Sequence, residues 1–427
     1  MIVVVGAGAA GLVAAIFARS TSGDVLLLER TTDGGRKILI SGGGRCNILP
    51  SSLHPERFVT DSPSPLLRGM LRSWPLTEQR TFFEHEVGIP LALEGETGKL
   101  FPASNRARDV RDGLMALARI RGVEVQTQTS VTAVEATAGS HRWRVATSRG
   151  DFDASSVILA TGGLSVPLTG SDGTGLNIAR KLGHQISPTY AALTPLTGST
   201  PLLASLSGIS LDVRIRAKWQ GRTIESHGGF LFTHRGYSGP SVLDVSHVAV
   251  RSREKRPQRS VPLDHTEPTS EVVSPAVLRV QWTDRDADTW SRELAATQGL
   301  VVNLLARHMP ERLAEVLCLE AGLPPDRRGP ELRRHERTAL VEALTSYELP
   351  WNGDEGYKKA EVTGGGVALT DVHPRTLESV RHPGLFMCGE MLDAFGPIGG
   401  YNFAWAWATG RAAGLGAAAG LKKDSGT

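Results

Sequence analysis

The chain has 427 residues, of which 40% are hydrophobic and 21% are charged, and this length predicts two or three ordinary globular domains. The formal net charge of +3 is too small to indicate a nucleic-acid partner. The three cysteines form no CxxC pair, which argues against a disulfide framework or a metal site and for a reducing compartment.

The N-terminal segment predicts a βαβ unit. Ile2–Val5 and Val25–Leu28 are apolar runs typical of buried strands, and Leu12–Arg19 is typical of an Ala-rich helix. The segment has no basic n-region and glycines interrupt it, so we do not expect a signal peptide. No other run has the length of a membrane span without charges or clustered glycine. We therefore expect a cytoplasmic protein without a membrane partner.

The turn of this unit carries the sequence Gly-Ala-Gly-Ala-Ala-Gly, a dinucleotide-binding fingerprint between a strand and a helix. Gly6 permits the tight turn, Gly8 lets the backbone approach a pyrophosphate, and Gly11 lets the helix pack closely on the strands. Ala9 and Ala10 open the helix, whose free N–H groups favour phosphate. Glu29 follows the second strand, where a carboxylate binds ribose hydroxyls and repels a 2′-phosphate.

Two further Gly-rich turns follow, at Gly34–Lys37 and Ser41–Asn47. Successive backbone N–H groups in such turns bind anions, and Arg36, Lys37 and Arg45 add positive charge. A simple NAD domain does not need this second cradle. The sequence therefore favours a larger dinucleotide, FAD, bound without a covalent bond.

The middle of the chain changes character. Val157–Ala160 predicts another buried strand, followed by Thr161 and Gly162. Residues 191–360 contain β-like segments, helical periodicity and two polar stretches, 251–259 and 264–274, which predict a solvated loop or hairpin. No aromatic residues alternate with these charges, so we do not expect nucleic-acid binding there.

The C-terminal part returns to the dinucleotide-fold pattern. A strand at Gly384–Cys388 delivers Gly389 and Glu390, and Asp393 follows as a candidate ligand for a polyol. Gly400, Tyr401 and Asn402 open a closing helix, whose N-terminus we expect at the pyrimidine side of a flavin. The predicted fold is an α/β, Rossmann-like FAD domain from both chain ends, residues 1–190 and 361–427, with an inserted β-plus-helical substrate domain at 191–360.

These segments resemble the bacterial FAD-binding proteins of the aminoacetone oxidase-like group, which are NAD(P)/FAD-dependent oxidoreductases of the glutathione-reductase type. The resemblance rests on GAGAAG at 6–11, GRKILISGGGRCN at 35–47, FTHRGYSGP at 232–240, EVTGGGV at 361–367 and the segment 389–410. The group's usual Thr-Met-Glu-Ser-Lys is TLESV at 376–380, so a lysine role is not carried over.

The resemblance implies which residues surround FAD. With the residues derived above, the expected cofactor contacts are Gly6, Gly8, Ala9, Ala10, Gly11, Glu29, Arg30, Gly35, Arg36, Lys37, Ser41, Gly42, Gly44, Arg45, Cys46, Asn47, Val131, Thr161, Gly162, Gly389, Glu390, Asp393, Gly400, Tyr401 and Asn402. Val131 is expected to contact adenine through its backbone.

Two residues are candidates for catalysis. Arg45 lies in the second Gly-rich turn, and His234 can move protons near neutral pH. Cys46, beside Arg45, is either a small packing residue or a reactive thiol.

The predicted function is hydride transfer between a small organic substrate and FAD. NAD(P)H is a conceivable reductant, although no second fingerprint supports a site for it. The alternatives are a flavin-binding regulatory protein and a flavin-dependent RNA-modifying enzyme, with a plain NAD dehydrogenase as a more distant possibility. The sequence does not specify the oligomeric state.

Overall fold

The structure is a computed structural model that describes residues 1–19, 23–137, 142–253 and 275–424. Most of the two polar stretches predicted as a solvated loop lies outside the described residues. The chain divides into two compact units, Met1–Ala191 with Glu361–Thr427, and Ala192–Ala360.

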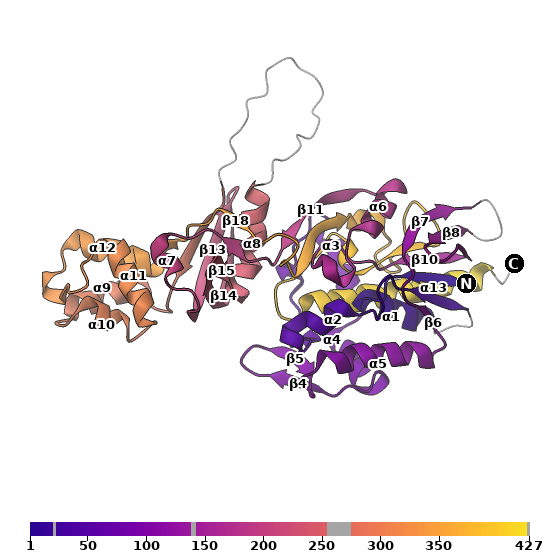
Figure 1. The fold of residues 1–427 in the computed structure, drawn as a ribbon, viewed down its shortest axis with the longest axis horizontal. Helices are drawn as coiled ribbons and strands as arrows, with labels where there is room; N and C mark the ends of the chain where they lie inside the picture. Colours follow the sequence, from indigo (N-terminus) through magenta and orange to yellow (C-terminus); the bar gives the residue numbers. More distant parts are fainter. Residues whose placement is uncertain (20–22, 138–141, 254–274, 425–427) are drawn as a thin grey trace, which may run out of the picture. The chain divides into compact units, whose positions relative to one another are not determined.

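The first unit is built on a five-stranded parallel sheet of order β20-β10-β1-β2-β6 (Figure 1). Its strands are β1 (Ile2–Val5), β2 (Val25–Leu28), β6 (Glu124–Gln126), β10 (Ser156–Leu159) and β20 (Leu385–Met387). Every residue of β1, β2 and β10 is buried, as in parallel sheets covered on both faces. The predicted Rossmann-like α/β fold is confirmed.

Two helices pack side by side in this unit: α1 (Ala9–Ala18) and α13 (Tyr401–Asp424) (Figure 1). Glycines on α13 make the contact close. A Cβ at Gly410 would lie 2.4 Å from the Ala10 carbonyl oxygen, and one at Gly414 would lie 2.3 Å from that of Ala14. The N-terminal and C-terminal parts of the chain therefore share one core.

Smaller elements complete the first unit. The three-stranded sheets are β3 (Leu49–Pro50), β5 (Lys99–Pro102) and β4 (Leu91–Glu94), and β7 (Val131–Ala136), β8 (Trp143–Thr147) and β9 (Phe152–Ala154); β11 (Ile186–Ala192) pairs with β19 (Val362–Val367). The remaining α-helices are α2 (Arg36–Ile40), α3 (Ser64–Arg72), α4 (Leu76–Thr81), α5 (Ala107–Ile120) and α6 (Thr174–Lys181).

The second unit contains a seven-stranded antiparallel sheet of order β17-β16-β13-β14-β15-β12-β18. Its strands are β12 (Leu196–Thr197), β13 (Ser210–Trp219), β14 (Arg222–Thr233), β15 (Gly236–Ser238), β16 (Val277–Gln281), β17 (Tyr347–Glu348) and β18 (Gly353–Asp354). Its helices are α7 (Pro201–Ala204), α8 (Pro240–Arg253), α9 (Ala287–Ala296), α10 (Val301–Leu305), α11 (Glu311–Glu320) and α12 (Arg334–Thr345). Its own core buries Phe230, Phe232, Trp282 and Trp290.

In the described part of the chain, no helix combines the length and apolar character that a membrane span requires.

Candidate functional site

A cavity of about 740 Å³ opens at the carboxyl ends of the parallel strands of the first unit. Val5, Leu28 and Ala160, at the ends of β1 and β2 and just after β10, line it. This is where open α/β sheets bind their ligands. All residues that line the cavity belong to the first unit.

Most of the predicted cofactor residues meet at this cavity. The predicted residues that line it are Gly6, Gly8, Ala9, Ala10, Glu29, Arg30, Gly35, Arg36, Lys37, Ser41, Gly42, Arg45, Asn47, Val131, Thr161, Gly162, Glu390, Gly400 and Asn402. The predicted residues that do not line it are Gly11, Gly44, Cys46, Gly389, Asp393 and Tyr401.

The first glycine turn has the geometry of a phosphate cradle. Gly6 has φ +102°, and a Cβ at Gly11 would lie 1.8 Å from the Gly6 carbonyl oxygen. A Cβ at Gly8 would meet nothing within 4 Å, so that side of the turn faces open space. No side chain caps α1, so the first N–H groups of this helix remain available to a ligand in this space. The cradle fits a diphosphate.

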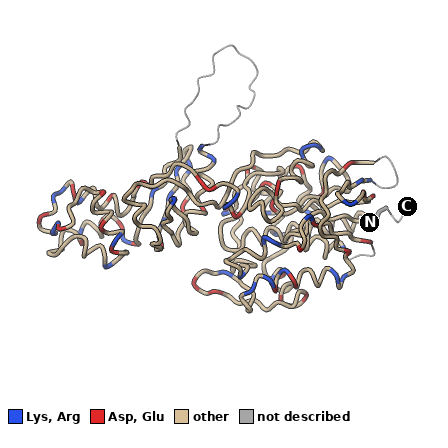
Figure 2. Tube along the Cα trace, viewed as in Figure 1, with Lys and Arg blue, Asp and Glu red and all other residues tan. Residues whose placement is uncertain are grey.

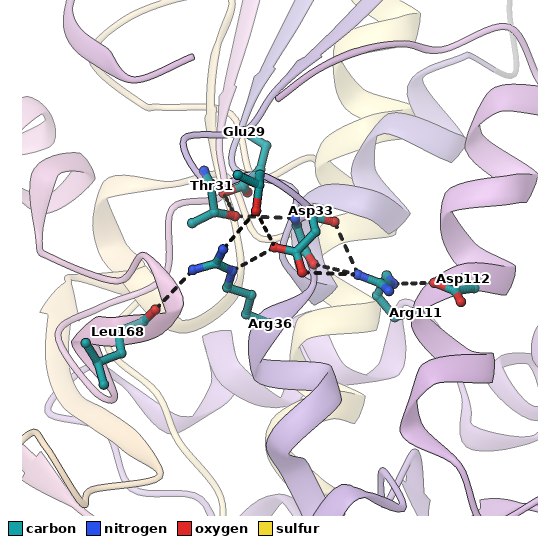
Figure 3. A network of polar contacts seen from close by, with 9 residues as sticks. Glu29, Thr31, Asp33, Arg36, Arg111, Asp112 and Leu168 are labelled. Atoms are coloured by element: carbon teal, nitrogen blue, oxygen red, sulfur yellow. Dashed lines mark hydrogen bonds and ion pairs between the residues drawn. The ribbon is translucent and has the colours of Figure 1, made fainter. Parts of the chain in front are cut away.

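Glu29 organises the turn beside this cradle (Figure 3). Its buried carboxylate accepts hydrogen bonds from the Ala7 N–H at 2.9 Å and from the Thr31 N–H and hydroxyl, both at 2.7 Å. Glu29 is also one of the residues that line the cavity. A carboxylate has about four acceptor positions, so ribose hydroxyls can bind in addition to these groups.

A charged network connects the next turn to the body of the unit (Figure 3). The Arg36 Nε lies 2.7 Å from Asp33, and a second Arg36 nitrogen reaches the Leu168 carbonyl at 3.5 Å. The hydrogen bond from Arg36 lowers the pKa of Asp33 below its usual value. Arg111 pairs with both Asp33 and Asp112. Arg36 is thereby held at the cavity wall.

Lys37 and Glu390 form an ion pair across the cavity wall. The Lys37 Nζ lies 2.5 Å from the Glu390 Oε2 and 2.6 Å from the Ser165 Oγ. The other oxygen of Glu390 accepts from the Ser165 hydroxyl at 2.6 Å and from the Thr363 N–H at 3.0 Å. Sequence reasoning missed both residues, because Ser165 stands in no recognisable motif and nothing in the EVTGGGV segment singles out Thr363.

The second Gly-rich turn, Ser41–Asn47, contains left-handed backbone at Gly42, Gly43 and Gly44, with φ between +55° and +85°. The Arg45 guanidinium lies 4.0 Å from the centre of the Phe101 ring and 3.1 Å from Glu94. Asn47, with its amide oriented to satisfy both groups, accepts from the Gly400 N–H and donates to the Leu49 carbonyl. The turn therefore supports the chain just before α13.

Cys46 is fully buried, and burial raises the pKa of its thiol to about 12. Both observations argue against the reactive-thiol interpretation, because a buried thiol with a raised pKa stays protonated at neutral pH. Cys46 packs in the core behind the turn.

Asp393 does not line the cavity either, although the next residue, Ala394, does. One of its carboxylate oxygens accepts from the Asp61 N–H at 3.1 Å and from the hydroxyls of Ser62 and Ser187 at 3.3 and 3.2 Å. The structure thus places the predicted polyol ligand in a buried internal network. Burial, followed by the nearby charge of Asp61, raises the pKa of this carboxyl.

Of the other residues outside the cavity, Gly44 is exposed in its turn, and Gly11, Gly389 and Tyr401 pack within the first unit. Gly11 and Gly389 pack against backbone or side chains of the core, and the Tyr401 ring lies tilted against the Phe58 ring, with 5.6 Å between the ring centres. His234 is exposed in the turn between β14 and β15 of the second unit. Among the described residues, no group of three or more His, Cys, Asp and Glu side chains gathers as metal ligands.

Three comparisons relate this chain to known proteins. Residues 1–416 match the family model described as "HI0933-like protein Rossmann domain". The chain is 32% identical to the "Ribosomal RNA dihydrouridine synthase" of Escherichia coli (strain K12), over 95% of each chain. It is 31% identical to the "3-dehydro-bile acid delta(4,6)-reductase" of Clostridium scindens, over 97% of this chain and 98% of the relative.

Two solved structures resemble the fold with a TM-score of 0.50. The 3-ketosteroid-delta4-(5alpha)-dehydrogenase from Rhodococcus jostii RHA1 is 16% identical, with 98% of this chain and 96% of that chain covered. The 3-ketosteroid delta1-dehydrogenase from Sterolibacterium denitrificans is 12% identical, with 98% and 99% covered. At these identities the likeness shows the fold alone.

Proposed function

The chain belongs to the HI0933-like Rossmann-domain family and is an FAD-dependent oxidoreductase, and from this premise we propose that it reduces a carbon–carbon double bond conjugated to a carbonyl group. One observation carries the proposal. Two relatives that align with at least 95% of the chain have different substrates, yet both names describe the reduction of double bonds. Dihydrouridine is uridine with two added hydrogens, and a delta(4,6)-reductase saturates a conjugated system.

The cavity residues fit FAD. The open space at Gly8 and the uncapped start of α1 suit the diphosphate, and Glu29 suits the ribose hydroxyls. Non-covalent binding is supported by the burial of Cys46, which removes the nearest thiol from the cavity. When bound, FAD supplies the hydride exchange, and the protein supplies position and electrostatics.

Two residues are proposed to assist the reaction. Arg45 lines the cavity and carries a cation at its wall. His234 is proposed as a proton-transfer residue of the second unit. His234→Ala is expected to lower turnover and leave flavin content unchanged, whereas Gly11→Val is expected to abolish flavin binding. Equal flavin loss in both variants would contradict the role assigned to His234.

The test of the proposed function uses protein reduced anaerobically with dithionite, so that it does not depend on whether NAD(P)H is the physiological reductant. The reduced protein is mixed with a 4-en-3-one steroid, with uridine-containing RNA, and with the saturated ketone as control. At least one conjugated compound is expected to reoxidise the flavin. Mass spectrometry of that compound is expected to show the addition of two hydrogens. Failure of both conjugated compounds to reoxidise the flavin would contradict the proposal.

A further inference from the structure

Charged residues of both signs are dispersed along the trace of both units (Figure 2), and most of the cationic residues that line the cavity have an ion-pair partner. Five cationic side chains line the cavity, and four of them pair with a carboxylate. The pairs are Arg30–Asp172, Arg36–Asp33, Lys37–Glu390 and Arg45–Glu94. Lys99 is the fifth, and it has no ion pair within the ranges that the structure describes.

The carboxylate opposite Lys99 on the neighbouring strand already has other partners. Glu94 on β4 is the cross-strand partner of Lys99 on β5. The Glu94 carboxylate binds the Arg45 guanidinium at 3.1 Å and the Thr97 hydroxyl at 2.5 Å. These hydrogen bonds, first that of Thr97 and then that of Arg45, lower the pKa of Glu94. Lys99 adds only a weaker electrostatic attraction to this lowering, so its side chain lines the cavity without a direct ion pair among the described residues.

The surroundings of Lys99 indicate what this charge can bind. A Cβ at Gly399 would lie 3.7 Å from the Lys99 Cε, so the lysine stem passes beside the turn that leads into α13. Phe101, two residues along β5, lines the same cavity, as does Phe403 of α13. Aromatic walls beside a free ammonium suit a flat conjugated molecule that carries a negative or carbonyl oxygen.

We propose that Lys99 binds the carbonyl oxygen of the substrate and stabilises the negative charge that forms on it during reduction. This inference rests on the proposed function. A hydride supplied by reduced FAD adds to the β-carbon, and the π electrons move to the carbonyl oxygen to give an enolate. A proton from solvent then adds at the α-carbon, so the substrate gains two hydrogens and the cofactor is oxidised. Lys99 donates a hydrogen bond to the enolate oxygen.

The test measures binding, and so does not depend on turnover. The probe is 4-nitrophenolate, a flat conjugated anion, and its affinity for the FAD-loaded protein is measured by equilibrium dialysis. Lys99→Met is expected to raise the probe Kd at least tenfold, while Lys99→Arg stays within about threefold of the wild type because the cation is kept. Lys181→Met, which removes an exposed lysine of α6 away from the cavity, is the matched control and leaves the Kd unchanged.

Further measurements separate a role of Lys99 in substrate binding from a role in cofactor binding. FAD content and the flavin midpoint potential are expected to be the same in Lys99→Met and wild type; altered values with unchanged probe affinity would assign Lys99 to the cofactor and overturn the proposal. Unchanged probe affinity alone, or a wild type that does not bind the probe, would also overturn it. If Lys99→Met does not fold, Lys99→Gln replaces it. The expected binding pattern without reduction of any conjugated compound would contradict only the proposed function.

Discussion

The Nζ of Lys37 lies 2.5 Å from the Oε2 of Glu390, although 353 residues separate the two in sequence. This pair joins α2 to the 3-10 turn that follows β20, Gly389–Met391, and both side chains line the cavity. Ser165 bonds to both partners, which fixes the loop after β10 to the same point. Three separate segments of the fold thus close one wall of the cavity.

Lys37→Met is predicted to weaken FAD binding by roughly tenfold or more, because it leaves the partly buried Glu390 without its cation. Arg36→Met is the matched control, since it removes the same charge from the adjacent residue of α2, whose partner Asp33 is more exposed. Its effect on FAD affinity is expected to be several-fold smaller. Fluorescence titration of the apoprotein with FAD measures both, and equal effects would argue against a special role for the ion pair.

Gly8→Ala is predicted to weaken FAD binding, whereas Gly11→Ala is predicted to destabilise the protein itself. A methyl group at position 11 would lie 1.8 Å from the Gly6 carbonyl oxygen, so this variant is expected to lose roughly 1–3 kcal/mol of stability. A methyl group at position 8 meets open space in the protein alone and intrudes only on the diphosphate. Thermal melting of the apoproteins and FAD titration separate the two effects. A destabilised Gly8→Ala apoprotein would contradict this geometry.

The three cysteines are predicted to be unreactive in the native protein. Burial raises the pKa of Cys46, Cys318 and Cys388 to about 12 in each case, so the thiolate forms are scarce at neutral pH. A chromogenic disulfide reagent is expected to label no thiol rapidly in the native protein at neutral pH. After unfolding, it is expected to label three thiols per chain. Rapid labelling of one thiol in the native protein would show that a cysteine is accessible.

Asp393 is predicted to make stability depend on pH. Burial, and then the charge of Asp61, raise its pKa above 3.8, so the folded state holds the proton to a higher pH than the unfolded state. This contribution to stability is present below pH 3.8 and is lost as the pH rises through the folded pKa. Asp393→Asn does not ionise and keeps an acceptor oxygen. Between about pH 4 and pH 7, the melting temperature of Asp393→Asn is expected to fall less than that of the wild type. The same fall in both proteins would contradict a raised pKa at Asp393.

The parts of the site that depend on local sequence were predictable. The first glycine turn, the two strands around it and Glu29 follow each other within 30 residues, and their geometry is fixed by backbone sterics and strand order. The helix α2 was not predicted, because only five residues, beginning after the left-handed Gly35, form it inside a Gly-rich segment.

The parts that depend on long-range packing were not predictable. The sequence placed Asp393 beside a polyol because it follows a strand end. The 3-10 turn at Gly389–Met391 changes the direction of the chain, and Asp393 joins Asp61, Ser62 and Ser187 instead. The sequence also could not predict that Lys99 lacks an ion pair. This depends on which carboxylates the other cationic residues bind in the folded protein.

The identity of the bound flavin tests the central claim, that the cavity of the first unit holds FAD non-covalently. The purified protein is precipitated with acid, and the flavin is identified by chromatography and quantified against protein. We predict one FAD per chain in the supernatant and a colourless pellet. A protein without flavin, FMN in place of FAD, or yellow colour retained in the pellet would contradict the account.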